Sequence, residues 1–326
     1  IDDIEKGIIK TPTDPNKTFS DDPLRMLRAV RFSCELNFDI DTETQNSIKK
    51  NSNRLEILSS ERISDEINKI LMCDTPSNGF KNLEKLNLLN HILPELIDLK
   101  GVEEVEGQTH KDNFYHTLEV VDNISRNTEN VWLRWAALLH DIGKATTKKF
   151  NKKIGWTFHG HEFIGSKMVK KIFTRLSLPL NEKLKYVQKI VMMSSRPIII
   201  SEDIVTDSAV RRLIYDAGDD IDDLLTLCEA DITTKNMKKS LIYQNNFKIV
   251  RQKIKDVEER DSIRNFQPPI TGEIIMAYFN IKPCKEIGLI KERIKNAILD
   301  GEIRNDYKEA HDLMVKTGKS LGLKNE

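Results

Sequence analysis

Apolar residues recur every three or four positions along most of this chain, and this spacing limits the possible folds more than any other feature. Within residues 23–36, Leu24, Leu27, Val30 and Cys34 fall on one side of a helix. That period is typical of an amphipathic α-helix, whereas a strand would alternate with a period of two. The same spacing predicts helices over residues 41–51, 60–73, 80–89, 114–124, 131–144, 161–176, 181–193, 208–217, 224–230 and 235–260, with two more beyond residue 270.

Strand signals are nearly absent from the sequence. Only Ile198-Ile199-Ile200 forms a short β-branched run, and it follows Pro197 directly. We therefore predict an all-α fold with boundaries near residues 105 and 265, the second beside the Gln267-Pro268-Pro269 linker. The expected domains are a multi-helix neck and body in residues 1–105, a second helical domain in 106–265 and a small helical tail in 266–326. A polar tail is expected to end the chain.

Composition excludes few classes of function. Of 326 residues, 39% are hydrophobic and 31% charged, which suits a chain with sizeable cores. Lys+Arg and Asp+Glu both number 51, so any contact with nucleic acid must come from local patches. The four cysteines form no C-x-x-C pair, which favours reduced thiols. Without an apolar run near the roughly 18 residues of a membrane span, we expect no membrane contact and a cytoplasmic location.

The sharpest chemical pattern is His140-Asp141, which ends an apolar helix and precedes a Gly-Lys turn. Imidazole and carboxylate together suit Mg, Mn, Ni, Co, Zn or Fe. Two residues cannot close a metal site, so other helices must supply ligands. Further candidates in chain order are His116, His159, His161 and Asp231.

Taken singly, these candidates have ordinary explanations. His116 alone would be a partly buried core histidine, Asp231 a carboxylate at a helix end and His159 a turn residue. Their order and their flanking text, FYHTLEVV, LLHDIGK, FHGHE and CEADITTKN, nevertheless resemble the HD phosphohydrolase superfamily. The resemblance implies an HD-type metal-dependent phosphohydrolase domain in residues 106–265.

The resemblance also assigns roles to individual residues. It implies that His116, His140, Asp141 and Asp231 hold a divalent metal of unknown identity. In that superfamily the metal polarises a phosphate oxygen and activates a water. Catalytic roles fall on His140 and Asp141 and on two further residues: Lys144, which would neutralise a phosphate oxygen, and His161, with a supporting, substrate-binding or second-metal role.

One stretch departs from that pattern. Two-metal HD enzymes often place another histidine before an Arg-Pro-like turn, whereas VMMSSRP has Ser194 and Ser195 there. Serine is a poor ligand for a borderline metal. The sequence thus favours one metal, or a weakly held second, and leaves open a site that binds metal but hydrolyses little.

The segment DDPLRMLRAVRF carries a second pattern. Asp22 and Arg25 are three residues apart at the start of a predicted helix, with Asp21 or Asp22 as N-cap and Pro23 at the first helical position. Such spacing usually means a cap and a surface ion pair. The same carboxylate and guanidinium could also pair with the edge of C or A. Arg28 and Arg31 lie on the same side of the predicted helix and could face the phosphates of a nucleotide.

This text resembles the neck of class II tRNA nucleotidyltransferases (CCA-adding enzymes) and bacterial poly(A) polymerases. DDIEKGIIK, SERISDE and LPEL resemble further motifs of that family, and SERISDE is expected to be a buried ionic support for the neck. The resemblance implies that Asp22, Arg25, Arg28 and Arg31 bind an incoming nucleotide. It implies ATP or CTP and the 3′ end of a tRNA or other RNA as partners, and a parent protein that adds CCA, CC or A.

The family's catalytic head is expected to be missing from this chain. A head needs a Gly-Gly phosphate loop and a D-x-D pair, and neither precedes Asp3. The pairs Asp219-Asp220 and Asp222-Asp223 lack an accompanying strand or glycine-rich loop. The chain also opens at Ile1 without Met, as a fragment would, with residues 1–20 as the link to the head. Alone, it is not expected to add nucleotides.

Three functions remain open on the sequence. The chain is the base-selecting, RNA-binding and phosphohydrolase part of an RNA 3′-end nucleotidyltransferase, an RNA-binding body with a vestigial HD site, or a free-standing HD nucleotide hydrolase. Basic stretches that could contact phosphate, or simply be solvated, are Lys144–Lys153, Lys167–Arg175 and Lys235–Arg260.

Overall fold

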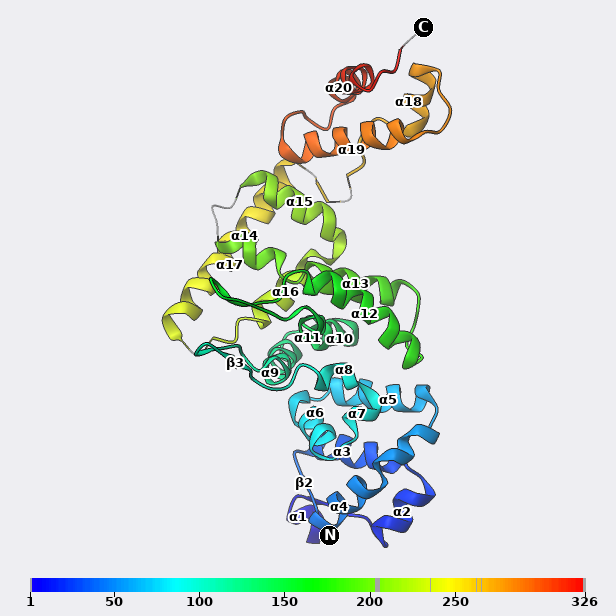
Figure 1. The fold of residues 1–326 in the computed structure, drawn as a ribbon, viewed down its shortest axis with the longest axis vertical. Helices are drawn as coiled ribbons and strands as arrows, with labels where there is room; N and C mark the ends of the chain where they lie inside the picture. Colours follow the sequence, from blue (N-terminus) through cyan, green and yellow to red (C-terminus); the bar gives the residue numbers. More distant parts are fainter. Residues whose placement is uncertain (1, 203–205, 235, 262, 265, 325–326) are drawn as a thin grey trace. The chain divides into compact units, whose positions relative to one another are not determined.

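The computed structural model describes residues 2–202, 206–234, 236–261, 263–264 and 266–324. Ile1 and Lys235, which entered the sequence predictions, lie outside the described residues. The described chain is predominantly helical, and its strands are two or three residues long (Figure 1), which confirms the predicted all-α class. No described helix has both the length and the apolar character that crossing a membrane requires.

The chain divides into two compact units, which we describe separately. The first holds residues up to Ser195 together with Asp222–Leu241, and the second holds Arg196–Ile221 together with residues from Ile242 onward. These units follow contacts within the chain. The predicted division into three domains at residues 105 and 265 remains a prediction.

The N-terminal part of the first unit is a stack of short helices. Its elements are α1 (Asp2–Glu5), α2 (Pro15–Asp21), α3 (Leu24–Leu36), α4 (Thr42–Asn51), a 3-10 turn η1 (Ser52–Ile57), α5 (Ser60–Leu71), α6 (Pro76–Lys85), α7 (Leu89–Ile92) and α8 (Pro94–Ile97). Strand β1 (Ile8–Ile9) pairs in parallel with β2 (Asp39–Ile40). Helices α3, α5 and α6 pack on one another around residues such as Met26, Ile67 and Phe80.

The rest of the first unit carries the histidines of interest. Its helices are α9 (Asn113–Ser125), α10 (Val131–Leu139), α11 (Lys144–Thr147), α12 (His161–Arg175), α13 (Glu182–Met193) and α16 (Ile221–Ala230). Helix α10 is buried from Leu133 to Leu139 and packs against both α9 and α13, so it forms the centre of this part.

Arg134 on α10 joins these helices to the N-terminal stack. It is buried, and its guanidinium donates to the carbonyl oxygens of Leu71 (2.7 Å) and Cys73 (3.0 Å) near the end of α5. It also donates to Ser125 and Thr128, both at 2.9 Å, near the end of α9. One side chain thus satisfies carbonyl groups that the helix ends would leave without partners.

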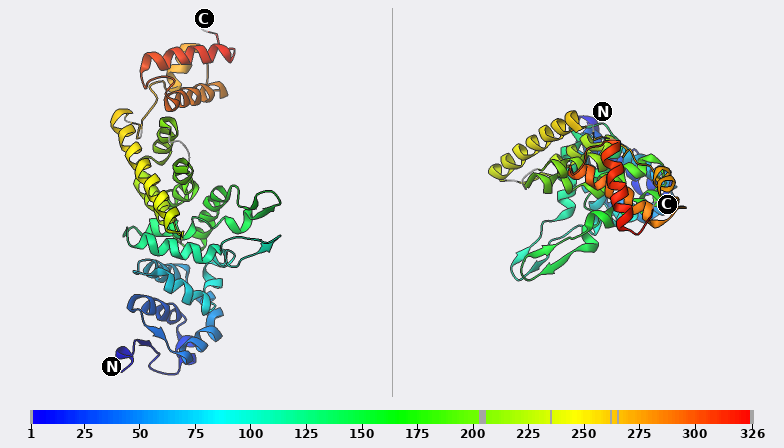
Figure 2. Two further views of the ribbon diagram at one scale, coloured as in Figure 1. Left: turned by 90° about the vertical axis from the view of Figure 1, so that its left-hand side faces the viewer. Right: turned by 90° about the horizontal axis from the view of Figure 1, so that it is seen from above.

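Two β-hairpins interrupt the helices of the first unit. Strands β3 (Glu104–Val105) and β4 (Gln108–Thr109) form the first, and β5 (Lys149–Asn151) and β6 (Gly155–Thr157) the second. The hairpins lie side by side (Figure 2), and Trp156 Nε1 donates to the Gln108 carbonyl at 3.1 Å. No strand was predicted at the second hairpin, whose first strand lies within the basic stretch Lys144–Lys153.

The second unit contains the C-terminal helices. They are α14 (Arg196–Glu202), α15 (Asp207–Ala217), a 3-10 turn η2 (Gly218–Asp220), most of α17 (Met237–Asp261), α18 (Gly272–Phe279), α19 (Lys285–Asp300) and α20 (Tyr307–Ser320). Helix α20 corrects the expected polar tail, since Ala310 and Met314 on one of its faces are buried. Ile198–Ile200, the one weak strand signal, lies within α14.

Helix starts show two further corrections. The predicted helix started at residue 80, yet α6 begins at Pro76, because proline suits the first helical turn. Asp21 belongs to the end of α2 and is not a cap of α3. Asp22 is closer to the expected cap, since its Oδ1 accepts a hydrogen bond from the Leu24 amide at 3.3 Å.

Candidate metal centre and nucleotide-binding helix

The HD pair lies where α10 ends. His140 follows the last helical residue with helical backbone angles, and Asp141 comes next, so both side chains leave the buried end of the helix. Both are buried, as is His116 on α9. Asp231 follows the last residue of α16. Three helices distant in sequence thus direct polar groups toward one interior position.

The ligands predicted from the sequence converge there. His116 Nε2 lies 2.8 Å from Asp231 Oδ1, and His140 Nε2 lies 3.6 Å from the same oxygen. One ligand atom each from His116, His140 and Asp231 fall within 4.8 Å of one another, as a shared metal ion requires. Asp141 Oδ2 lies close to both rings, 3.3 Å from His140 Nε2 and 3.6 Å from His116 Nε2.

The hydrogen bonds of His140 test whether a cation fits. Its Nδ1 lies 2.8 Å from the Ala137 carbonyl oxygen, which can only accept, so Nδ1 carries a proton. The other nitrogen, Nε2, is buried without a hydrogen-bond partner and faces carboxylate oxygens. In the neutral ring Nε2 presents a lone pair, and only a proton or a metal cation can satisfy it beside those oxygens. The donor set therefore fits a divalent metal.

Charge interactions at the site point the same way. Burial would lower the pKa of His140, but Asp141 and Asp231 outweigh it and raise that pKa to about 10. Burial would raise the pKa of Asp141, yet His140 and Lys144 hold it well below its usual range. The pKa of Asp231 is also lowered, because its interactions with His116 and with the nearby ring of His140 outweigh its burial. The carboxylates are thus ionised and in need of positive charge.

The two further residues with predicted catalytic roles both contact Asp141. Lys144 Nζ forms an ion pair with Asp141 Oδ2 at 2.6 Å. His161 Nε2 lies 3.5 Å from Asp141 Oδ1, while its Nδ1 lies 2.9 Å from the Phe158 carbonyl oxygen. Their roles remain predictions. His159 is exposed, in agreement with its reading as a turn residue.

Serines 194 and 195 lie near the site without reaching its ligand atoms. Ser194 is buried and donates to the Val191 carbonyl at 3.0 Å. Ser195 donates to Glu162, whose other carboxylate oxygen lies 3.3 Å from His161 Nδ1. Glu162 was not singled out from the sequence, although its position directly after His161 was a usable signal.

The sequence did not indicate two further residues, which contact His116. Lys111 Nζ lies 2.9 Å from His116 Nδ1, and Thr233 Oγ1 lies 3.0 Å from the same nitrogen. Lys111 and Thr233 also contact each other. Burial lowers the pKa of Lys111, and nearby Glu119 and Asp231 partly offset that effect. Thr233 follows Asp231 by two residues, but nothing in the sequence indicated which histidine it would meet.

The predicted nucleotide-binding pair lies at the start of α3, where Arg25 is exposed and Asp22 is partly buried. Arg25 Nε lies 3.8 Å from Asp22 Oδ2, and Arg62 Nη2 lies 3.5 Å from Asp22 Oδ1. The Arg25 side chain is 54% exposed. Both polar groups are therefore accessible from solvent, and neither is committed to a buried partner.

Arg28 and Arg31 differ in their surroundings. Arg31 is 13% exposed, and its Nε lies 2.7 Å from Glu66 Oε2, a carboxylate that is 3% exposed. Its Nη1 also pairs with Glu35 at 2.6 Å. Arg28 is half exposed, 3.8 Å from Glu66 Oε1. Glu66 is thus the buried ionic support expected in SERISDE, and Arg28 is the more accessible of the two guanidinium groups.

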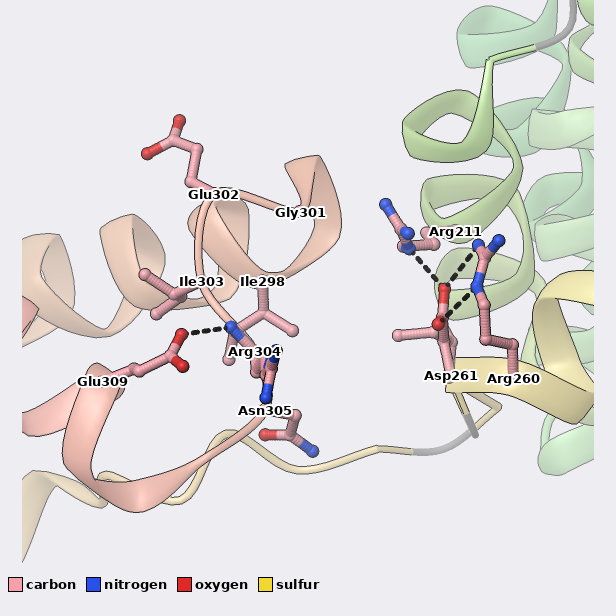
Figure 3. A pocket seen from close by; sticks show the side chains of 11 residues that line it. Arg211, Arg260, Asp261, Ile298, Gly301, Glu302, Ile303, Arg304, Asn305 and Glu309 are labelled. Atoms are coloured by element: carbon pink, nitrogen blue, oxygen red, sulfur yellow. Dashed lines mark hydrogen bonds and ion pairs between the residues drawn. The ribbon is translucent and has the colours of Figure 1, made fainter.

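The second unit contains a pocket of about 550 Å³ that no sequence signal indicated (Figure 3). Arg211 and Arg260 line one wall, and both donate to Asp261. On the opposite wall Glu309 accepts a hydrogen bond from the Arg304 amide at 2.7 Å. Both arginines of the first wall are therefore already paired with a carboxylate of the pocket itself.

The folding stability of the second unit should depend on pH through Asp207. Ion pairs with Lys253 (2.8 Å) and Arg260 (2.6 Å) lower the pKa of Asp207 to about 2. A carboxylate whose pKa falls on folding stabilises the fold above its unfolded pKa and loses that contribution as pH drops toward the folded value. We expect Asp207→Asn to lower Tm by about 1 to 3 °C at pH 6. In thermal unfolding scans that difference should disappear by about pH 2, and a constant difference would contradict the prediction.

Comparison with known proteins agrees with this geometry. Residues 37–99 match a family described as "Probable RNA and SrmB- binding site of polymerase A", and residues 113–236 match the HD domain. The A-adding tRNA nucleotidyltransferase of Deinococcus radiodurans is 27% identical over 310 residues, which cover 92% of this chain and 69% of that protein. The multifunctional CCA protein of Shewanella frigidimarina is 35% identical over 186 residues, 55% of this chain and 43% of that protein.

Solved structures show the same fold. The Bacillus stearothermophilus CCA-adding enzyme, determined in complex with CTP, superposes with a TM-score of 0.64 at 18% identity, covering 98% of this chain and 68% of that one. The match to the multifunctional CCA protein covers less than half of that protein's length. Together these findings support the tRNA nucleotidyltransferase and poly(A) polymerase family that the sequence resembles.

Proposed function

We propose that the chain is the base-selecting, RNA-binding and phosphohydrolase part of an RNA 3′-end nucleotidyltransferase of the CCA- or A-adding kind. The observation that carries the phosphohydrolase activity is His140 Nε2, buried, without a partner, and directed at Asp141 and Asp231. It lies inside the segment that matches the HD domain. A vestigial site would have little reason to retain this buried arrangement of opposite charges.

The chain's own residues set up the reaction as follows. His116, His140, Asp141 and Asp231 would hold a divalent metal, which when bound polarises a phosphate oxygen and activates a water. The ammonium of Lys144, which pairs with Asp141, would meet a second phosphate oxygen of the substrate. The Phe158 carbonyl keeps a proton on His161 Nδ1, so His161 Nε2 can accept a proton near Asp141.

Hydrolysis of 2′,3′-cyclic AMP and of a generic phosphodiester by the full chain tests this proposal. We expect turnover with at least one of Mn, Ni, Co or Mg and none without metal. Asp141→Ala should lower the rate by at least about 100-fold, because it removes a ligand and the partner of Lys144 together. Asp98, which is exposed and lies outside the site, supplies the control variant Asp98→Ala with unchanged activity.

Other outcomes would point elsewhere. No turnover with any metal would favour an RNA-binding body with an inactive HD site. Equal turnover by Asp141→Ala and the unaltered chain would show that the activity comes from other residues or from a contaminant.

We also propose that Asp22 and Arg25 select the incoming base. Both are accessible at the start of α3, and Arg62 lies beside Asp22. The carboxylate can accept from an exocyclic amine while the guanidinium donates to ring nitrogen and carbonyl, so the pair suits C or A. ATP, CTP and the RNA 3′ end are the proposed partners, and the centre of nucleotidyl transfer is proposed to lie outside these 326 residues.

Nucleotide binding by Arg25→Ala tests base selection. We expect the affinity of the chain for ATP and CTP to fall about 10-fold, since one charged hydrogen-bonding group is lost, and the affinity for inorganic triphosphate to stay the same. Isothermal titration measures all three. Arg126→Ala, at an exposed arginine after α9, should change none of them. An equal loss for triphosphate would show that Arg25 meets phosphate and not the base.

A further inference from the structure

Three histidines lie at the metal centre: His116, His140 and His161. They differ in the group that contacts Nδ1, the ring nitrogen that faces away from the carboxylates. His140 and His161 each direct Nδ1 at a carbonyl oxygen, that of Ala137 or Phe158. A carbonyl only accepts, so in both rings Nδ1 carries the proton and Nε2 can offer a lone pair to a metal. These two histidines are fixed in a tautomer suited to ligation.

His116 is held differently. Its Nδ1 faces the ammonium of Lys111 at 2.9 Å and the hydroxyl of Thr233 at 3.0 Å. An ammonium only donates, so a bond from charged Lys111 requires a lone pair on Nδ1. The single proton of the neutral ring then sits on Nε2, where Asp231 Oδ1 accepts it at 2.8 Å. In that tautomer Nε2 has no lone pair left for a metal.

The hydroxyl of Thr233 allows the opposite arrangement. A hydroxyl both donates and accepts, so it can accept from a protonated Nδ1 and leave the Nε2 lone pair open toward Asp231. Lys111 and Thr233 also contact each other, so both can act on the same ring nitrogen. The net charge of the imidazole is the same in the two arrangements.

We propose, on the basis of the metal site proposed above, that Lys111 and Thr233 control metal binding by selecting the tautomer of His116. Lys111 stabilises the form that donates from Nε2 to Asp231 and cannot ligate. Thr233 stabilises the form that ligates. Both are positioning residues, because they act through His116 and lie on its far side from the carboxylates.

The proposal predicts that substitutions of Lys111 and Thr233, which lie side by side in space, change the metal affinity in opposite directions. Lys111→Met removes a donor that competes with ligation and a positive charge near the metal, so the affinity for Mn²⁺ should rise about 10-fold. Thr233→Val removes the acceptor that the ligating tautomer needs, so the affinity should fall about 10- to 100-fold. Lys148→Met is the matched control, because Lys148 pairs with Glu103 away from the ligands, and its affinity should be unchanged.

Two measurements on the full chain test this. Titration with Mn²⁺ followed by electron paramagnetic resonance gives the affinities. Long-range ¹H–¹⁵N NMR of the metal-free chain at pH 7.5 gives the tautomer of His116, assigned by comparison with His116→Gln. We expect a proton on Nε2 in the unaltered chain and on Nδ1 in Lys111→Met.

Specific results would overturn the inference. A proton on Nδ1 of His116 in the unaltered metal-free chain would do so, as would a lower Mn²⁺ affinity in Lys111→Met, which would make Lys111 an acceptor or a packing residue. The NMR measurement needs no metal and no turnover. If it gives the expected tautomers while the unaltered chain binds no Mn²⁺, the proposed phosphohydrolase is wrong and tautomer selection by Lys111 still holds.

Discussion

Replacing His140 by alanine should weaken divalent-metal binding by more than about 100-fold and remove metal-dependent hydrolysis. Loss of an outer partner of a ligand costs 10- to 100-fold, and loss of a ligand itself should cost more. His140 Nε2 is the buried nitrogen without a partner, and its distances to Asp141 Oδ2 and Asp231 Oδ1 are 3.3 and 3.6 Å. The Ala137 carbonyl holds the proton of the neutral ring on Nδ1, so Nε2 is the nitrogen that is offered to a metal.

Equilibrium dialysis against Mn²⁺, with metal content measured in the protein, would check this result. His159→Ala is the matched control, since it removes the same side chain from an exposed turn close by in the sequence, and it should bind as the unaltered chain does. Thermal unfolding of both variants without metal separates loss of the ligand from loss of the fold. Unchanged affinity in a folded His140→Ala would mean that the centre is not a metal site.

Much of the fold could be predicted from the sequence, because apolar residues recur every three or four positions along most of its helices. The predicted segment 23–36 became α3, and 41–51 became α4 with Asp41 as its cap. The apolar period did not predict elements whose sequence is mostly polar or contains proline. Helix α20 buries only Ala310, Met314 and Gly318 in a polar segment, and the hairpin of β5 and β6 lies among lysines. In both places tertiary packing outweighs local composition.

The candidate site shows the same limit. His116, His140, Asp141 and Asp231 were predicted as a set from their order and flanking text, and the fold brings them together. The groups that orient them could not be predicted. Lys111 lies only five residues before His116, but Thr233 meets the same nitrogen from 117 residues away. A sequence pattern records which residues are present, and such pairings depend on how helices pack.

Arg31 illustrates the converse case. Its place on α3 suggested contact with phosphate, whereas the structure pairs it with Glu66 and Glu35 and places it over the Phe32 ring at 4.0 Å. Loss of Arg31 would leave this carboxylate, which is 3% exposed, with only Arg28 at 3.8 Å and Lys69 at 3.1 Å, both about half exposed, as partners. Arg31 is therefore held for the stability of the neck, and its nucleotide-binding role remains a prediction. Arg25 and Arg28 keep exposed side chains.

Gly143→Ala should lower metal-dependent hydrolysis by about 100-fold, because it moves His161, the proposed proton acceptor, without removing it. The backbone φ of Gly143 is −76°, which any residue can adopt, so the need for glycine is a need for space. A Cβ there would lie 2.2 Å from the His161 carbonyl oxygen and 2.8 Å from the Gly165 nitrogen. Both are backbone atoms, so α12 must shift and carry His161 away from Asp141. A displacement near 1 Å in an active site costs roughly this much.

Comparing the loss of kcat with the loss of Mn²⁺ affinity in Gly143→Ala distinguishes a displaced His161 from a damaged metal site. The three atoms nearest to a Cβ at Gly143 belong to His161 and Gly165 and not to His116, His140 or Asp231, so Mn²⁺ affinity should fall far less than kcat. Gly165→Ala tests the same contact from the other side, where the nearest atoms to a Cβ lie at 3.3 to 3.4 Å, and its effect should be several-fold smaller. If both variants lost metal binding as severely as activity, Gly143 would be supporting the ligands and not the position of His161.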